Sequence, residues 1–243
     1  MNIKRLARAL RTDIIVQFRN KLYHVGAIIS LMVAVAMAAL VGPTQMQNTV
    51  PAAILLIIGG TTMLYIAGMV IFEKDEGTIA ATIVAPLTTG EYITSKVASL
   101  VLLATLESLL SIYGASVIHA FQGEVVWPNP FWLILGILSV GTLFTLVGLA
   151  IVVRFQRITD FLIPMAGVAV IMQIPFVYFW GFFKHPILLL SPTSAPTMLM
   201  EAGYRPLVTW EQIYSLGYTC VAIIVFALLA KRAFRIHIIE KMG

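Results

Sequence analysis

Glu107 is the ionisable residue whose surroundings most need a chemical explanation, because it lies within the apolar stretch 97–120. A carboxyl group at the middle of a membrane-spanning helix costs on the order of 2.5–3.5 kcal/mol, so it should face other helices or water. Three roles remain open: a protonated acid hydrogen-bonded to a neighbouring helix, a polar clamp, or a group that binds a proton or substrate. His119 has no second metal ligand at a suitable spacing, so we predict an interface histidine and no metal site.

Motifs of common enzymes are absent from the sequence. There is no GxxxxGK[ST] phosphate loop, no HExxH and no GxSxG. The single cysteine, Cys220, excludes an intramolecular disulfide and a CxxC metal pair. We therefore expect a protein that is not an enzyme, and any ATP hydrolysis that drives it would occur in another chain.

The segment 73–96, EKDEGTIAATIVAPLTTGEYITSK, is the most patterned polar part of the chain. Gly77 permits a tight bend, and 78–84 can form a short helix that Pro86 stops. Glu91, three residues after a threonine, predicts a capping box at the start of the next helix. The result is a short helix between two bends, which could carry motion from a partner into two helices at once.

The elements around these residues are predicted to be membrane-spanning helices. Of the 243 residues, 60% are hydrophobic and 11% are charged, which excludes an ordinary soluble domain. The runs are continuously apolar rather than alternating, so helices are favoured over a β-barrel. About 20 residues cross a bilayer as a helix. Six stretches meet that requirement: 22–41, 52–72, 97–120, 131–153, 161–183 and 213–230.

The distribution of basic residues predicts the topology of the chain. The net charge of +5 could indicate a nucleic-acid partner. With the N-terminus inside, however, every Lys and Arg except Lys184 and Arg205 falls on the inner side. Because short inner loops are enriched in Lys and Arg, we predict that both termini are cytoplasmic and that nucleic acid is not a partner. Ala34, Ala36 and Ala38 resemble a cleavage site, but we favour an uncleaved first span.

The segment 1–21 has a helical period of its own. Apolar residues recur on one face at spacings of three and four, and basic residues gather on another, including Lys4, Arg5, Arg8 and Arg11. Such a helix is expected to lie in the inner membrane interface, with its cations near anionic headgroups. The alternative is a basic tail that only sets topology.

These features together resemble the permease subunit of an ABC type-2 transporter, over essentially the whole chain. The resemblance is carried by Glu76-Gly77-Thr78, Pro86-Leu87, Glu91 and Lys96, with the six spans and the N-terminal helix. The opening MNIKRLARALRTDIIVQFRNKLY is also similar to permeases of fluoroquinolone transport systems. The resemblance implies an all-α membrane protein with the fold of type V exporters, in a prokaryotic inner membrane.

In that family the loop after the second span carries a coupling helix that docks on an ATPase subunit. The resemblance therefore implies a partner ATPase dimer that binds ATP and Mg²⁺, and a second permease copy or a paralogue. It assigns contact with the ATPase to the following residues: Glu73, Glu76, Gly77, Thr78, Pro86, Leu87, Glu91 and Lys96.

The segment 184–212 contains four prolines, which break any continuous helix. Members of the family have short re-entrant helices on the outer side here, which 187–190 and 198–200 could supply. The alternative is a disordered surface loop. Relatives also line their pathway with the second and fifth spans, where methionine and aromatic residues suit apolar cargo. The alternative for any one residue is ordinary helix packing or lipid contact. The pathway candidates are Tyr65, Met69, Phe72, Met172, Gln173 and Phe176.

The resemblance thus implies the permease subunit of an ATP-driven exporter, and the apolar residues of the pathway candidates favour an amphipathic or hydrophobic, drug-like or lipid-like compound. One alternative is a proton-coupled carrier that uses Glu107. This reading is weakened because paired interrupted half-repeats are absent from the sequence. The other is a scaffold or immunity subunit that binds a peptide without moving it.

Overall fold

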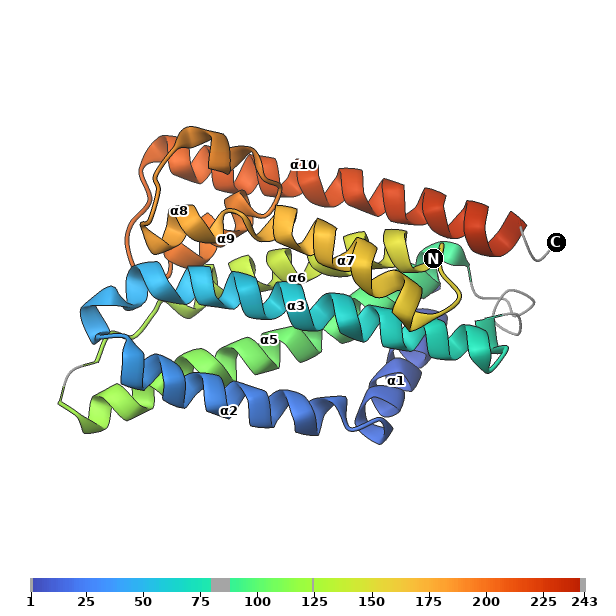
Figure 1. The fold of residues 1–243 in the computed structure, drawn as a ribbon, viewed down its shortest axis with the longest axis horizontal. Coiled ribbons are helices and arrows are strands. Elements are labelled where there is room, and N and C mark those ends of the chain that lie inside the picture. The colour runs from blue at the N-terminus through green and yellow to red at the C-terminus, as the bar shows by residue number, and fades with distance from the viewer. Residues whose placement is uncertain (1, 80–87, 124, 241–243) are drawn as a thin grey trace.

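The computed structural model describes residues 2–79, 88–123 and 125–240, and every regular element in them is helical (Figure 1). Pro43 and Pro130 occupy first-turn positions, where a missing N–H costs nothing. The elements in chain order are α1 (Ile3–Arg19), α2 (Leu22–Leu40), η1 (Pro43–Gln45), α3 (Met46–Asp75), α5 (Thr89–Phe121), α6 (Pro130–Val152), α7 (Ile158–Gln173), α8 (Phe176–Trp180), η2 (Pro186–Leu190), α9 (Ser194–Glu201), α10 (Thr209–Phe234) and the π-helical turn η3 (Arg235–Ile239).

Among the described residues, five helical segments are long and apolar enough to cross a membrane. They are Leu22–Leu40, Pro43–Asp75, Thr89–Phe121, Pro130–Val152 and Thr209–Ile239. The expected span 161–183 differs from these, because it is divided into α7 and the short α8. Pro175 lies at the division, where its ring and its missing N–H prevent α7 from continuing.

The long helices run side by side along the longest axis of the molecule, and α1 crosses them at one end (Figure 1). The start of α1 and the end of η3 lie at this end, together with the last turn of α3 and the first turn of α5. We name it the Lys96 end. The opposite end holds η1, α8 and α9, and we name it the Arg205 end.

The centre of the bundle is the contact of α3 with α6, supported by α5, α7, α9 and α10. Ile54 and Ile58 of α3 and Leu143 and Phe144 of α6 are buried in one apolar cluster. Gly59 lets the helices approach closely, since a Cβ there would lie 2.7 Å from the Phe144 ring. Large apolar residues on α2 and α10 point outward, as expected for contact with lipid. They include Ile28, Met32, Val35, Ile213, Ile224 and Leu228.

The segment 184–212 contains the predicted short helices, η2 and α9. All of α9 from Ser194 to Met200 is buried, against α6, α10 and α3. A Cβ on Gly136 of α6 would lie 2.6 Å from the backbone nitrogen of Met200. Residues 193–200 are therefore an integral layer of the bundle, whereas 184–187 are exposed.

Candidate functional site

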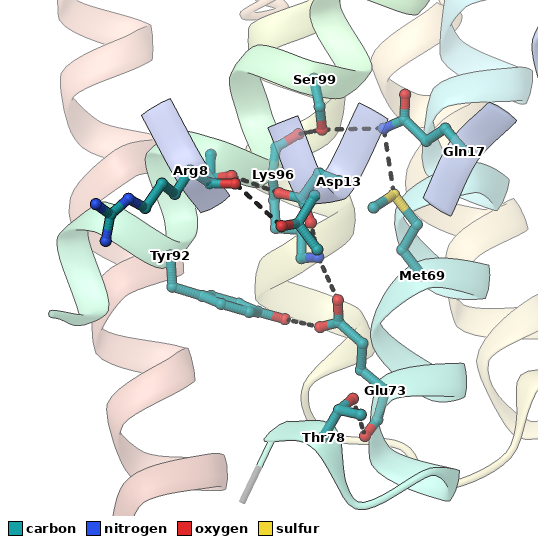
Figure 2. Close-up of polar contacts among 11 residues, drawn as sticks. Arg8, Asp13, Gln17, Met69, Glu73, Thr78, Tyr92, Lys96 and Ser99 are labelled. Atoms are coloured by element: carbon teal, nitrogen blue, oxygen red, sulfur yellow. Dashed lines mark hydrogen bonds and ion pairs between the residues drawn. The ribbon is translucent and has the colours of Figure 1, made fainter. Parts of the chain in front are cut away.

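A cluster of ionised and hydroxyl groups joins α1, α3 and α5 at the Lys96 end (Figure 2). Lys96 Nζ donates to Asp13 Oδ1 at 2.5 Å and also to Glu73 Oε1. Ser95 Oγ donates to Asp13 Oδ2 at 2.5 Å, and the Tyr92 hydroxyl donates to Glu73 Oε2 at 2.6 Å. We name these five residues the Lys96 cluster. It fixes the position of three helices relative to one another.

Because the Lys96 cluster is largely buried, each of its charged groups depends on the others for stabilisation. The Lys96 side chain is 2% exposed, that of Asp13 10% and that of Glu73 24%. All four carboxylate oxygens accept a hydrogen bond, so no buried acceptor of the pair is left without a donor. Two carboxylates around one ammonium leave an excess negative charge, and removing the ammonium would leave two close acids. The cluster is thus sensitive to any movement of one helix away from the others.

The N-terminal helix packs on the bundle through its polar residues. Gln17 is fully buried, and its Nε2 donates to Ser99 Oγ at 2.9 Å and to the Met69 sulfur at 3.4 Å (Figure 2). The predicted helix is confirmed, and its cations Lys4, Arg5, Arg8 and Arg11 are exposed. Sequence reasoning missed Asp13 and Gln17. A usable signal was that Asp13 is the only acid before Glu73.

Glu91 connects the first turns of α1 and α5. The predicted capping box is confirmed, because Thr88 Oγ1 accepts from the Glu91 N–H and Glu91 Oε2 accepts from the Thr88 N–H at 2.9 Å. The other oxygen, Oε1, accepts from the backbone N–H of Asn2 at 2.6 Å. Asn2 in turn caps α1 by accepting from the Lys4 N–H. One carboxylate therefore holds both helix starts together.

Lys74 extends the connection to α6 and the turn before α7. Its Nζ donates to the carbonyl of Val153 at 2.9 Å and to that of Phe155 at 2.7 Å. These carbonyls follow the last turn of α6, where a cation is favourable. Sequence reasoning counted Lys74 only as an inner cation, because nothing in the sequence pairs it with residues 79 and 81 positions later.

The Lys96 cluster lies on the wall of a cavity of about 460 Å³. Met69 and Phe72 contribute apolar wall, and Glu76 and Thr78 lie on it as well. Gly77 has φ +69°, which supports the predicted bend. Pro86, Leu87 and most of the predicted short helix lie outside the described residues. Of the eight residues assigned to ATPase contact, Glu73, Glu76, Thr78 and Lys96 share this cavity.

The pathway candidates do not gather in one cavity. Met69 and Phe72 are at the Lys96 end, whereas Met172 is buried in the main apolar cluster and Phe176 packs partly against it. Gln173 Nε2 donates to the Leu56 carbonyl at 3.1 Å, which holds α7 on α3. Their assignment to a pathway remains a prediction.

Glu107 lies at a contact between α2, α3 and α5. It is 6% exposed, and its Oε1 accepts from the Tyr65 hydroxyl at 3.2 Å. A Cβ on Gly26 of α2 would lie 1.8 Å from the same oxygen, so α2 passes the carboxyl group very closely. The geometry provides a hydrogen-bond partner and a tight fit, as a polar clamp between helices requires.

A family model and two curated relatives both match this chain to export permeases. Residues 4–242 match the sequence model of the Fluoroquinolones export permease protein family. Two curated relatives, both named Fluoroquinolones export permease protein, come from Mycobacterium tuberculosis strains CDC 1551 / Oshkosh and ATCC 25618 / H37Rv. Each is 29% identical to this chain, over 98% of both chains. With its five long apolar helices, this is a multi-pass membrane protein, and it belongs to the Fluoroquinolones export permease protein family.

Proposed function

We propose that this chain is the transmembrane permease subunit of an ATP-driven ABC exporter. A separate ATPase dimer docks on the segment 73–96 and binds the ATP and Mg²⁺. The cargo is an amphipathic or hydrophobic compound, and the names of the relatives favour drug-like aromatic molecules. The observation that carries the proposal is membership of an export-permease family by a chain whose sequence has no phosphate loop.

The Lys96 cluster supplies a route for coupling. Glu73 lies in the last turn of α3 and Lys96 in the second turn of α5, on either side of the proposed docking segment. A push on that segment changes the distance between their charged groups, and Asp13 transfers the change to α1. Coupling requires an element with two arrangements that both sites influence, and a buried charged junction suits that role.

The remaining architecture of the proposal follows the resemblance to type V exporters. The α7–α8 segment provides the sixth crossing, both termini face the cytoplasm, and η2 and α9 are re-entrant helices near the exit. Two copies, or one copy and a paralogue, form the pathway in a prokaryotic inner membrane. The basic residues concentrated at the Lys96 end support this orientation.

The first test is to purify the tagged chain from its own membrane in mild detergent and identify co-purifying proteins by mass spectrometry. We expect a stoichiometric partner with a phosphate-loop motif, and either this chain alone or a second permease beside it. A chain that purifies alone even after crosslinking would contradict the proposal. Proton-dependent transport removed by Glu107→Gln would then favour a carrier, and ligand binding without transport would favour a scaffold.

A second test compares two glycines with left-handed backbone at opposite ends of the bundle. Gly77 has φ +69° and Gly123 has φ +95°, and a Cβ at either position meets no atom within 4 Å. Gly77→Val and Gly123→Val therefore impose similar backbone strain. Gly77→Val and Glu76→Arg should abolish ATP-dependent transport in vesicles without reducing membrane insertion, whereas Gly123→Val should retain it. Equal transport by all three variants would exclude 73–96 as the coupling segment.

A further inference from the structure

A second hollow at the Lys96 end lies between α6, α7 and α10, away from the Lys96 cluster. Its volume is about 510 Å³. Most of its wall is apolar, with Val147 and Ile151 from α6, Val168 from α7, and Phe226 and Leu229 from α10. We name it the α10 groove. Of the three helices that form its walls, α6 and α10 are long and apolar enough to cross the membrane, so a hydrocarbon chain can occupy the groove beside them.

The charged residues of the α10 groove are two arginines. Arg154 and Arg232 line it together with His237, and no Asp or Glu among the described residues does. The side chains of Arg154 and Arg232 are exposed and make no hydrogen bond or ion pair to another described residue. This contrasts with the cavity beside the Lys96 cluster, where three acids meet two cations. The groove thus has two guanidinium groups with unused donors above an apolar slot.

We propose that the α10 groove binds one anionic phospholipid. The phosphate lies between Arg154 and Arg232, whose planar guanidinium groups match phosphate oxygens in pairs. One acyl chain lies along the apolar walls toward the middle of the bundle. Basic pockets between membrane helices near the inner leaflet suit such headgroups, because both the charge and the chain are satisfied at once. This inference does not depend on ATP-driven transport.

The bound lipid would connect α10 to the rest of the bundle. In an 18-residue apolar stretch of Thr209–Ile239, which contains α10, only 22% is buried. The corresponding value for α6 is 67%. A lipid in the groove contacts α6, α7 and α10 together, and so it fills a contact that protein side chains leave open. We expect anionic lipid to increase the thermal stability of the purified chain more than a zwitterionic lipid does.

The test is native mass spectrometry of the delipidated full-length chain, titrated with phosphatidylglycerol or with phosphatidylcholine of the same acyl chains. We expect one phosphatidylglycerol to bind with clear preference. The double variant Arg154→Gln, Arg232→Gln should weaken its binding by about 10- to 30-fold and abolish the preference over phosphatidylcholine. Equal binding of the two lipids by the unaltered chain would overturn the proposal.

Matched variants separate the groove from general charge attraction. Arg157→Gln with Lys231→Gln removes the same charge from neighbouring positions that do not line the groove, and it should retain the preference. Leu229→Trp fills the apolar part of the groove, whereas Leu228→Trp changes an exposed neighbour outside it. Only Leu229→Trp should reduce binding. Equal losses in a variant and its control, or displacement of the lipid by millimolar inorganic phosphate, would contradict a phospholipid site.

Discussion

Each end of the bundle contains one basic side chain between two carboxylates, and the two clusters differ in what they connect. At the Arg205 end, Arg205 Nε donates to Glu201 at 2.8 Å, and its two terminal nitrogens donate to the two oxygens of Glu211, each at 2.8 Å. These partners are four and six residues away. Lys96 instead binds partners 83 and 23 residues away, on two other helices.

The two clusters differ in how much they contribute to holding their end of the bundle together. The Arg205 side chain is 32% exposed, and its hydrogen bonds to Glu211 raise the pKa of the guanidinium further, so its charge is constant. Its ion pairs join adjacent elements that the chain already holds close. The Lys96 side chain is 2% exposed, and its ion pairs supply the contact between distant elements. We infer that the Lys96 end is held by charge and the Arg205 end by packing.

Lys96→Met should give the largest loss of stability. Asp13 and Glu73 would remain close together without their cation, which typically costs about 3–5 kcal/mol for a buried pair. The measurement is the free energy of unfolding in mixed micelles. As a control, the triple variant Lys96→Met, Asp13→Asn, Glu73→Gln removes all three charges and should recover much of the loss. If Lys96→Met lowers the free energy of unfolding by less than Arg205→Gln does, the inference that charge holds the Lys96 end together is wrong.

Gly136→Ala should give the next largest loss and test the packing of the Arg205 end. The added Cβ would lie 2.6 Å from the Met200 nitrogen and 2.9 Å from the Pro196 carbonyl oxygen, and backbone atoms of a buried helix cannot easily move away. We expect a loss of about 2–3 kcal/mol. Gly141→Ala is the control on the same helix, since its nearest neighbour is at 3.6 Å. It should be neutral or stabilise the helix by up to about 1 kcal/mol. Equal effects would exclude close packing as the cause.

Much of the fold could be predicted from apolar run length, because a span needs a fixed number of helical residues. The ends of α2 and α6 agree with the expected spans 22–41 and 131–153 within one residue. Helix α3 begins at Met46 rather than near 52, because its first turns accept polar residues that a hydropathy pattern excludes. The capping box at Thr88 was predictable because it is local in sequence.

The candidate site could be predicted only in part. Glu73 and Lys96 were identified through the family resemblance, but their pairing with Asp13 depends on how α1 crosses α5. No periodicity specifies that crossing. The same limit applies to Lys74 and to the Arg154 and Arg232 pair, whose significance lies in contacts between helices. Sequence patterns thus located the helices, and three-dimensional packing decided which charges meet.

Arg205→Gln should lower stability by less, about 1–2 kcal/mol. The side chain is one-third exposed, so water screens the remaining Glu201 and Glu211 charges. Arg205→Lys is the informative control, because it keeps the charge and loses the paired contact with Glu211. We expect the free energy of unfolding of Arg205→Lys to lie between that of Arg205→Gln and that of the unaltered chain. A loss as large with Lys as with Gln would mean that geometry, rather than charge, gives this cluster its stability.

Thr88→Ala should give the smallest effect, and it asks whether the Lys96 end is a single unit. Loss of the cap typically costs about 1 kcal/mol, while Thr88→Ser keeps the hydroxyl and should be neutral. Hydrogen exchange by mass spectrometry should become faster in the first turn of α5. Because Glu91 also accepts from the Asn2 N–H, faster exchange should extend to the start of α1, 86 positions earlier in the chain than Thr88. Faster exchange confined to α5 would show that the two helix starts are held independently, and coupling through Glu91 would then be excluded.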